Sequence, residues 1–174
     1  MNPNLSVAII GLALIGAGLS STIADAATRR IVGPNAGGGT TAASVTARSG
    51  AVVRGRGVKT DGQGDATAVS AAAVRGPNGA TAVRAGATTR SAAGSVQHQS
   101  GSSVQGAKGS VDSSGSASKT ADGQIAQSRT TTAISSTTGN SATTTGSYNS
   151  STGRSRATTC YDAAGATIAC PARP

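Results

Sequence analysis

The sequence predicts an all-β repeat, either a β-solenoid or a stack of β-arches, built from units of about 15 residues. Three observations lead to this fold class. Glycine makes up 25 of the 174 residues and recurs at similar intervals, the segments between glycines are rich in Thr, Ser and Val, and Phe and Trp are absent. Because few large apolar side chains are available to offset chain entropy, we expect substantial disorder and no conventional globular core.

Residues 1–26 are interpreted as a signal peptide. An uncharged apolar run of 13 residues, 7–19, has the length of a signal-peptide hydrophobic region and is too short to cross a bilayer as a helix. Ala24 and Ala26 place small residues at the two positions that signal peptidase reads, which predicts cleavage before Ala27. No stable membrane span is expected after cleavage. The alternative is an uncleaved anchor that uses residues 5–24.

The segment that follows the leader, residues 27–47, is expected to be flexible and basic. It carries Arg29 and Arg30 and the triple glycine 37–39, and glycine-rich segments behave as flexible coils.

Residues 48–159 form a Gly/Ser/Thr-rich, low-complexity region that carries the predicted repeat. Dipeptides such as Asp61-Gly62 and Asn78-Gly79 predict chain reversals. A second glycine inside several units predicts two short strands of about five residues in each. The alternative is a disordered region, because glycine-rich linkers look periodic by chance. The turn glycines, spaced by 12 to 17 residues, are Gly50, Gly62, Gly79, Gly94, Gly109, Gly123, Gly139, Gly153 and Gly165, and the internal glycines are Gly86, Gly101, Gly115 and Gly146.

The C-terminal segment, residues 160–174, is predicted to be a small hairpin closed by a disulfide. Its two cysteines, Cys160 and Cys170, bracket nine residues centred on Ala164-Gly165, a spacing that suits a bridge across a hairpin. The alternative is a pair of free thiols, whereas a zinc site would lack ligands. A disulfide implies an oxidising compartment, so the protein is expected to be secreted, extracellular or at the cell surface, or in the periplasm.

The charge balance points to polyanions as partners. The chain carries 15 Lys and Arg against 6 Asp and Glu, and nine of the cations lie in residues 27–90. A basic stretch of this kind attracts acidic polymers, although no aromatic residue is interleaved there to stack on bases. The alternative is that the charge keeps strand edges apart. The candidate contact residues are Arg48, Arg54, Arg56, Lys59, Arg75, Arg84 and Arg90.

The sequence offers no constellation for acid–base or nucleophilic catalysis, so we expect no enzyme activity, cofactor, metal or small-molecule substrate. Glu is absent, and His98 is the single histidine, interpreted as a solvated strand residue. Residues 116–119 match S-x-x-K, a motif that requires a helix start in a large folded domain, and we interpret the match as chance.

These features predict an exported structural, extracellular-matrix or surface protein, with a β repeat that assembles into fibres through its strand edges. In its Gly-, Ser- and Thr-rich composition the chain resembles curlin-type amyloid repeats, but the regularly spaced Gln and Asn of that family are missing. The alternative is a disordered basic protein that binds polyanions such as envelope polysaccharide, lipid phosphate or extracellular DNA. An ice-binding surface is a third hypothesis, suggested by the Thr-x-Thr pairs 130–132 and 143–145.

Overall fold

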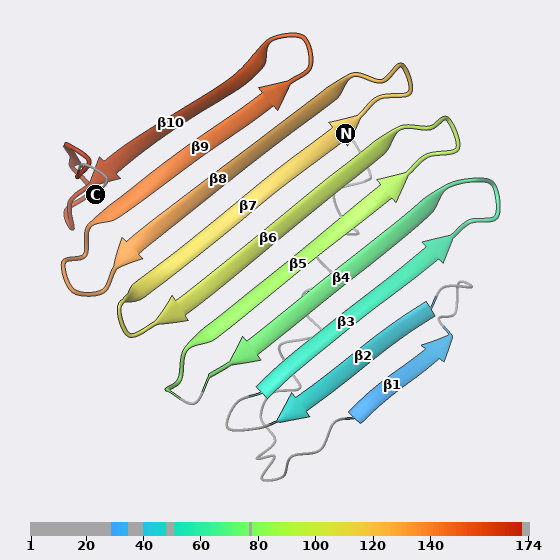
Figure 1. Ribbon diagram of the computed structural model, residues 1–174, viewed down its shortest axis with the longest axis horizontal. Coiled ribbons are helices and arrows are strands. Elements are labelled where there is room, and N and C mark those ends of the chain that lie inside the picture. The colour runs from blue at the N-terminus through green and yellow to red at the C-terminus, as the bar shows by residue number, and fades with distance from the viewer. Residues whose placement is uncertain (1–28, 35–39, 48–50, 77, 172–174) are drawn as a thin grey trace.

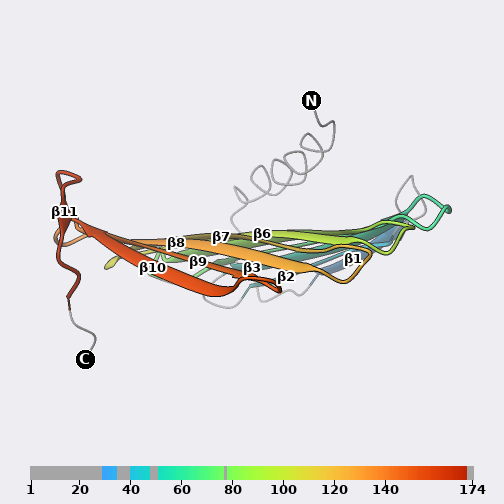
Figure 2. The ribbon, with the colours of Figure 1, turned by 90° about the horizontal axis from the view of Figure 1, so that it is seen from above.

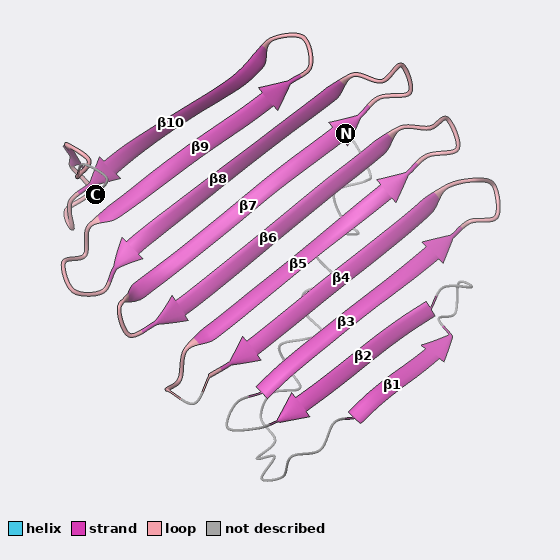
Figure 3. Ribbon diagram, viewed as in Figure 1, coloured by secondary structure: helices cyan, strands magenta, loops and turns pink. Residues whose placement is uncertain are grey.

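The computed structural model describes residues 29–34, 40–47, 51–76 and 78–171. They form one antiparallel sheet in which each strand pairs with its neighbours in the sequence, in the order β1 to β11 (Figures 1 and 3). The strands are β1 (Arg29–Pro34), β2 (Thr40–Ala47), β3 (Ala51–Thr60), β4 (Ala66–Arg75), β5 (Thr81–Arg90), β6 (Val96–Gly106), β7 (Gly109–Lys119), β8 (Ile125–Ser135), β9 (Ser141–Asn149), β10 (Gly153–Tyr161) and β11 (Thr167–Ile168).

The sheet is a single layer, and seen from above the strands β1 to β10 lie in one thin, gently twisted band, with the C-terminal segment that carries β11 at its end (Figure 2). Only two hydrophobic side chains are buried in the part of the chain whose burial is described, Ala73 at 6% and Cys160 at 4% exposed. Valines on both faces remain open to solvent, among them Val69 at 49% and Val104 at 46% exposed. The sheet is therefore held by its backbone ladder and cross-strand side-chain pairs rather than by a core.

The predicted turn glycines do mark the chain reversals. Eight of the nine have positive φ and lie at the turns between strands, from Gly62 (77°) to Gly165 (84°), while Gly50 lies outside the described residues. Positive φ is a conformation that glycine adopts without steric cost. The period of about 15 residues is therefore one long strand plus one tight turn.

The expectation of two short strands per unit is wrong. The internal glycines lie within continuous strands of 9 to 11 residues, for example Gly86 in β5 and Gly115 in β7, because a glycine in extended conformation keeps its place in the ladder. Each unit adds one antiparallel strand to an open sheet, and a β-solenoid or stack of arches is not confirmed.

Strands lie in both segments that follow the predicted leader. β1 and β2 lie in the segment 27–47, and the Gly/Ser/Thr-rich region from residue 51 onward is a continuous sheet. The predicted signal peptide, with Ala24, Ala26 and Ala27, lies outside the described residues.

Several turns share one local design. They are the turns 91–95, 120–124 and 162–166. In each, the backbone N–H of the first residue donates a hydrogen bond to the carbonyl oxygen of the fifth, and the fourth residue is a glycine with positive φ. The Ser, Thr or Asp side chain at the first position also accepts a hydrogen bond from the backbone N–H of the fifth, at 3.2, 3.0 and 2.8 Å respectively. Such three-residue loops, a tight turn followed by a left-handed residue, return the chain antiparallel to itself.

The C-terminal hairpin continues the same sheet. β10 runs through the boundary expected at residue 160, and β11 pairs only with Cys160 and Tyr161. The predicted disulfide joins Cys160 to Cys170, with their Cα atoms 5.3 Å apart.

Candidate polyanion-binding face

The strand register assigns each side chain to one of two faces, because paired residues point the same way and neighbours along a strand alternate. One row of paired residues crosses the sheet from β10 to β3 and carries three arginines on the same face. This row is Arg156, Gly146, Arg129, Gly115, Ser100, Gly86, Ser70 and Arg56.

Extending the alternation along each strand places eight of the ten cations of β3–β10 on this one face, which we call the basic face. They are Arg54, Arg56, Arg84, Arg90, Lys119, Arg129, Arg154 and Arg156. The other two, Lys59 and Arg75, lie on the opposite face together with Asp112, the one acidic residue in these strands. We call this second face the hydroxyl face, because Ser and Thr dominate it on β7–β10.

The predicted polyanion contacts are therefore divided between the faces. Arg54, Arg56, Arg84 and Arg90 lie together on the basic face, whereas Lys59 and Arg75 point the other way. Arg48 lies outside the described residues.

Sequence reasoning missed half of the basic face. The cations of β7–β10 fall in the part of the chain with the lower net charge, yet they project beside those of β3 and β5. These cations are Lys119, Arg129, Arg154 and Arg156. Two-residue alternation along continuous strands, combined with the length of each connecting loop, would have aligned them, but the assumed break at each internal glycine removed that signal.

The acidic residues between the strands are held in turns. The Asp61 carboxylate accepts hydrogen bonds from the N–H groups of Gln63 and Asp65, and the Asp162 carboxylate accepts from Ala164 and Ala166. Asp65 accepts from the Ala92 N–H of a neighbouring turn at 2.7 Å. These negative charges are therefore at strand ends and leave the middle of the basic face positive.

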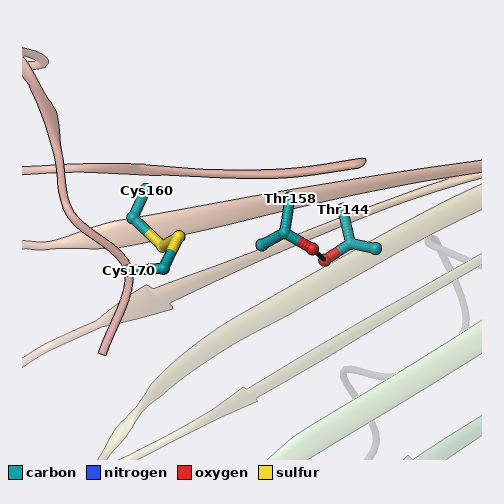
Figure 4. Close-up of a disulfide and its surroundings, with 4 residues drawn as sticks. All are labelled: Thr144, Thr158, Cys160 and Cys170. Carbon is teal, nitrogen blue, oxygen red and sulfur yellow. Dashed lines mark hydrogen bonds between the residues drawn. A yellow bond between two sulfur atoms is a disulfide. The ribbon is translucent and has the colours of Figure 1, made fainter. Parts of the chain in front are cut away.

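Hydroxyl groups support the basic face between its cations. The Ser113 and Thr131 hydroxyls are 2.9 Å apart across β7 and β8, and those of Thr144 and Thr158 are 3.0 Å apart across β9 and β10 (Figure 4). His98, expected to be solvated, is half-buried and its Nδ1 is 2.8 Å from the Thr88 hydroxyl. Cross-strand pairs of this kind each add a few tenths of a kcal/mol to about 1 kcal/mol of sheet stability.

The disulfide joins the last long strand, β10, to the segment that follows β11. Figure 4 shows the Cys160–Cys170 bridge beside Thr158, and the Cys160 side chain is buried. The bond indicates an oxidising compartment, extracellular or periplasmic. No helix among the described residues has the length and apolar character to cross a membrane.

The other candidate motifs do not assemble a reactive site. The S-x-x-K match runs along β7, where alternation turns Ser116 to the hydroxyl face and Lys119 to the basic face. The two Thr-x-Thr pairs do lie side by side on the hydroxyl face, Thr130 opposite Thr145 and Thr132 opposite Thr143. Their neighbours are Ser114 and Asp112 on β7 and Ala157 and Thr159 on β10, so one Thr row is two strands wide and the other is three.

Neither a protein-family model, nor a characterised protein, nor a solved structure matches this chain.

Proposed function

We propose that this protein is an exported surface or matrix protein whose basic face binds an extended acidic polymer, with phosphate or carboxylate groups. The observation that supports the proposal is the segregation of charge, with eight cations on one face of β3–β10 and the single strand carboxylate, Asp112, on the other. Cations spread only for solubility would be expected on both faces of a sheet that is open on both sides.

The spacing of these cations suits a chain-like ligand rather than a compact one. Adjacent strands lie about 4.8 Å apart, so Arg56 on β3 and Arg156 on β10 lie about 34 Å apart across seven strand spacings. Arg129 lies between them in the same row, two strands from Arg156. A polymer that crosses the strands along this row meets successive guanidinium groups, which pair well with phosphates and carboxylates.

Recognition of this kind is electrostatic and carries little sequence information. Tyr148 is the only tyrosine of β3–β10 on the basic face, since Tyr161 lies on the hydroxyl face, and the half-buried His98 is the only other aromatic ring there. Base-stacking platforms interleave several aromatic side chains with the cations. The proposal therefore predicts similar binding of acidic polysaccharide and nucleic acid at equal charge density.

The test compares two double variants of equal charge in binding to single-stranded oligodeoxythymidylate and to polygalacturonate. Arg129→Gln with Arg156→Gln removes two cations from the basic face, and Lys59→Gln with Arg75→Gln removes two from the hydroxyl face. Each lost phosphate contact lowers the slope of log affinity against log salt by about 0.7. The first variant should therefore lose roughly 1.4 in slope, and the second should bind as the wild type does. Equal losses in both variants would refute a face-specific site.

Assembly into fibres is a second candidate, favoured by one observation. β11 covers only Cys160 and Tyr161 of β10, so residues 153–159 of β10 have no outer strand partner among the described residues. An open edge invites strand addition, although Arg154 and Arg156 on this strand are the type of residue that opposes it. Fibre diffraction of the oxidised protein tests this candidate, and the absence of a reflection at about 4.7 Å under assembling conditions would exclude it.

A further inference from the structure

The hydroxyl face is a second broad surface, and it differs from the basic face in charge. Lys59 and Arg75 lie near the ends of their strands, and Asp112 is the only other charged residue that β3–β10 place there. Its middle row is uncharged and small throughout. The residues of this row are Gly55, Ala71, Ala85, Gly101, Ser114, Thr130, Thr145 and Ala157.

A sheet normally buries at least one face against a second layer. Here the described residues leave apolar side chains open on both faces, including Val83 at 48% and Ile134 at 43% exposed on the hydroxyl face and Val58 at 47% on the basic face. The structure thus presents one layer of an arrangement that usually has two.

Charge determines which face can pack against the same face of a second copy of the chain. Two basic faces brought together would oppose eight cations to eight, with no carboxylate of β3–β10 between them, which is strongly repulsive at low dielectric. Two hydroxyl faces would each bring a net charge of one, from Lys59, Arg75 and Asp112, and the two cations lie at the rim. Of the two faces, the hydroxyl face alone is therefore compatible with face-to-face self-association.

The hydroxyl face is also large enough to form a stable interface between two copies of the chain. Eight strands about 4.8 Å apart, each about 30 Å long, give a face of about 1,000 Å² per copy. A stable protein–protein interface buries about 800 Å² per partner. Full overlap of two such faces reaches this size.

The polar groups on this face are already partly paired, which lowers the cost of covering them. The hydroxyls of Ser116 and Ser128 are 2.9 Å apart, those of Ser147 and Ser155 are 2.8 Å apart, and Thr132 and Thr143 are 3.1 Å apart. Each pair lies on the hydroxyl face and is formed within one chain.

We propose that two copies of this chain pack face to face through their hydroxyl faces and form a two-layer sandwich. Sheets packed in this way lie about 10 Å apart. Both basic faces then point outward, so that one dimer holds two acidic polymers and crosslinks them. Only this crosslinking rests on the proposed polymer binding, while the dimer itself is measured without any polymer.

The test uses the oxidised protein and one substitution on each face. Ser114→Lys places a cation in the middle of the hydroxyl face, and Ser70→Lys makes the same change at an exposed serine of the basic face. Light scattering after size-exclusion chromatography should give twice the chain mass for the wild type and for Ser70→Lys. Ser114→Lys should dissociate at least about 10-fold more readily, because it buries one added cation per copy that Asp112, two residues away on the same face, offsets only in part.

A wild type that is monomeric at high micromolar concentration would overturn the proposal, as would an equal effect of the two substitutions. If Ser114→Lys fails to fold by circular dichroism, the wild-type melting temperature decides the question. For a dimer it rises with protein concentration, and a value independent of concentration overturns the proposal.

Discussion

Substituting alanine at three glycines tests the division into turn and strand glycines, because the three positions differ in the structure. Gly123 has φ 92° and an added Cβ would meet nothing within 4 Å, whereas at Gly109 (φ 142°) it would overlap the carbonyl oxygen of Ile134. Gly101 lies inside β6 and is not among the positive-φ glycines, and an added Cβ would lie 3.7 Å from the Ser113 oxygen.

The expected losses follow from these environments. Alanine at positive φ costs about 1–2 kcal/mol, and for a chain of this size each kcal/mol lowers the melting temperature by about 2–4 °C. Gly123→Ala should therefore melt roughly 2–8 °C below the wild type. At Gly109 the backbone overlap between β7 and β8 adds on the order of 1–3 kcal/mol, for a loss of at least about 4 °C.

Gly101→Ala is the matched control, because alanine at a compatible strand position reduces the freedom of the unfolded chain. It should leave the melting temperature unchanged or raise it, by an effect of about 0.4–1 kcal/mol. Thermal melts followed by circular dichroism at one protein concentration measure all three. The reasoning is refuted if Gly109→Ala and Gly123→Ala have the same melting temperature, or if Gly101→Ala has the lowest melting temperature of the three.

Two further predictions concern the ends and turns of the sheet. Replacing both cysteines, Cys160→Ser with Cys170→Ser, should lower the free energy of unfolding by about 2–3 kcal/mol, since the bridge closes a loop of 10 residues. If reductant does not change the urea midpoint of the wild type, this prediction is contradicted. Asp65→Ala should cost about 1–2 kcal/mol, because its carboxylate joins two neighbouring turns through the Ala92 N–H. Asp122→Ala is the control, because in that turn the Thr120 hydroxyl, and not the aspartate, accepts the hydrogen bond from the backbone. An equal loss of unfolding free energy in the two variants would show that the hydrogen bond between neighbouring turns does not stabilise the sheet.

The positions of the turns could be predicted from the sequence, because glycine with a preceding Asn or Asp has a strong local preference for reversal. The continuity of the strands could not, since Gly86 in a strand and Gly94 in a turn are chemically identical, and only the ladder and the neighbouring residues distinguish them. One distinguishing signal was present in the sequence. Ser91 and Thr120 lie three residues before a turn glycine, and each side-chain hydroxyl accepts a hydrogen bond from the backbone N–H of the residue that follows that glycine.

The choice between a solenoid and a flat meander depends on how each turn returns the chain. A three-residue loop such as 92–94 brings the next strand antiparallel beside the last one, whereas a solenoid needs an arc that advances to a new rung. Composition alone does not contain this difference, and both folds use small side chains and few apolar ones.

The basic face shows the same limit at the level of the site. Counting charge along the chain separated Arg54 from Arg156 by about a hundred residues and assigned them to regions of unequal charge. The register places both on one face, because the uninterrupted strands keep the alternation, while the connections β6–β7 and β8–β9, with an even number of residues between paired positions, each shift it by one residue number.

Arginine footprinting with and without a bound polyanion tests most directly whether the basic face is the binding surface. The oxidised protein is treated with an arginine-specific dicarbonyl reagent, alone and with single-stranded oligodeoxythymidylate, and modification is read by mass spectrometry. We predict that Arg56, Arg129 and Arg156 become protected on addition of the oligomer while Arg75, on the hydroxyl face, reacts as before. Equal protection of Arg75, or no change at Arg129 and Arg156, would contradict the proposed binding surface.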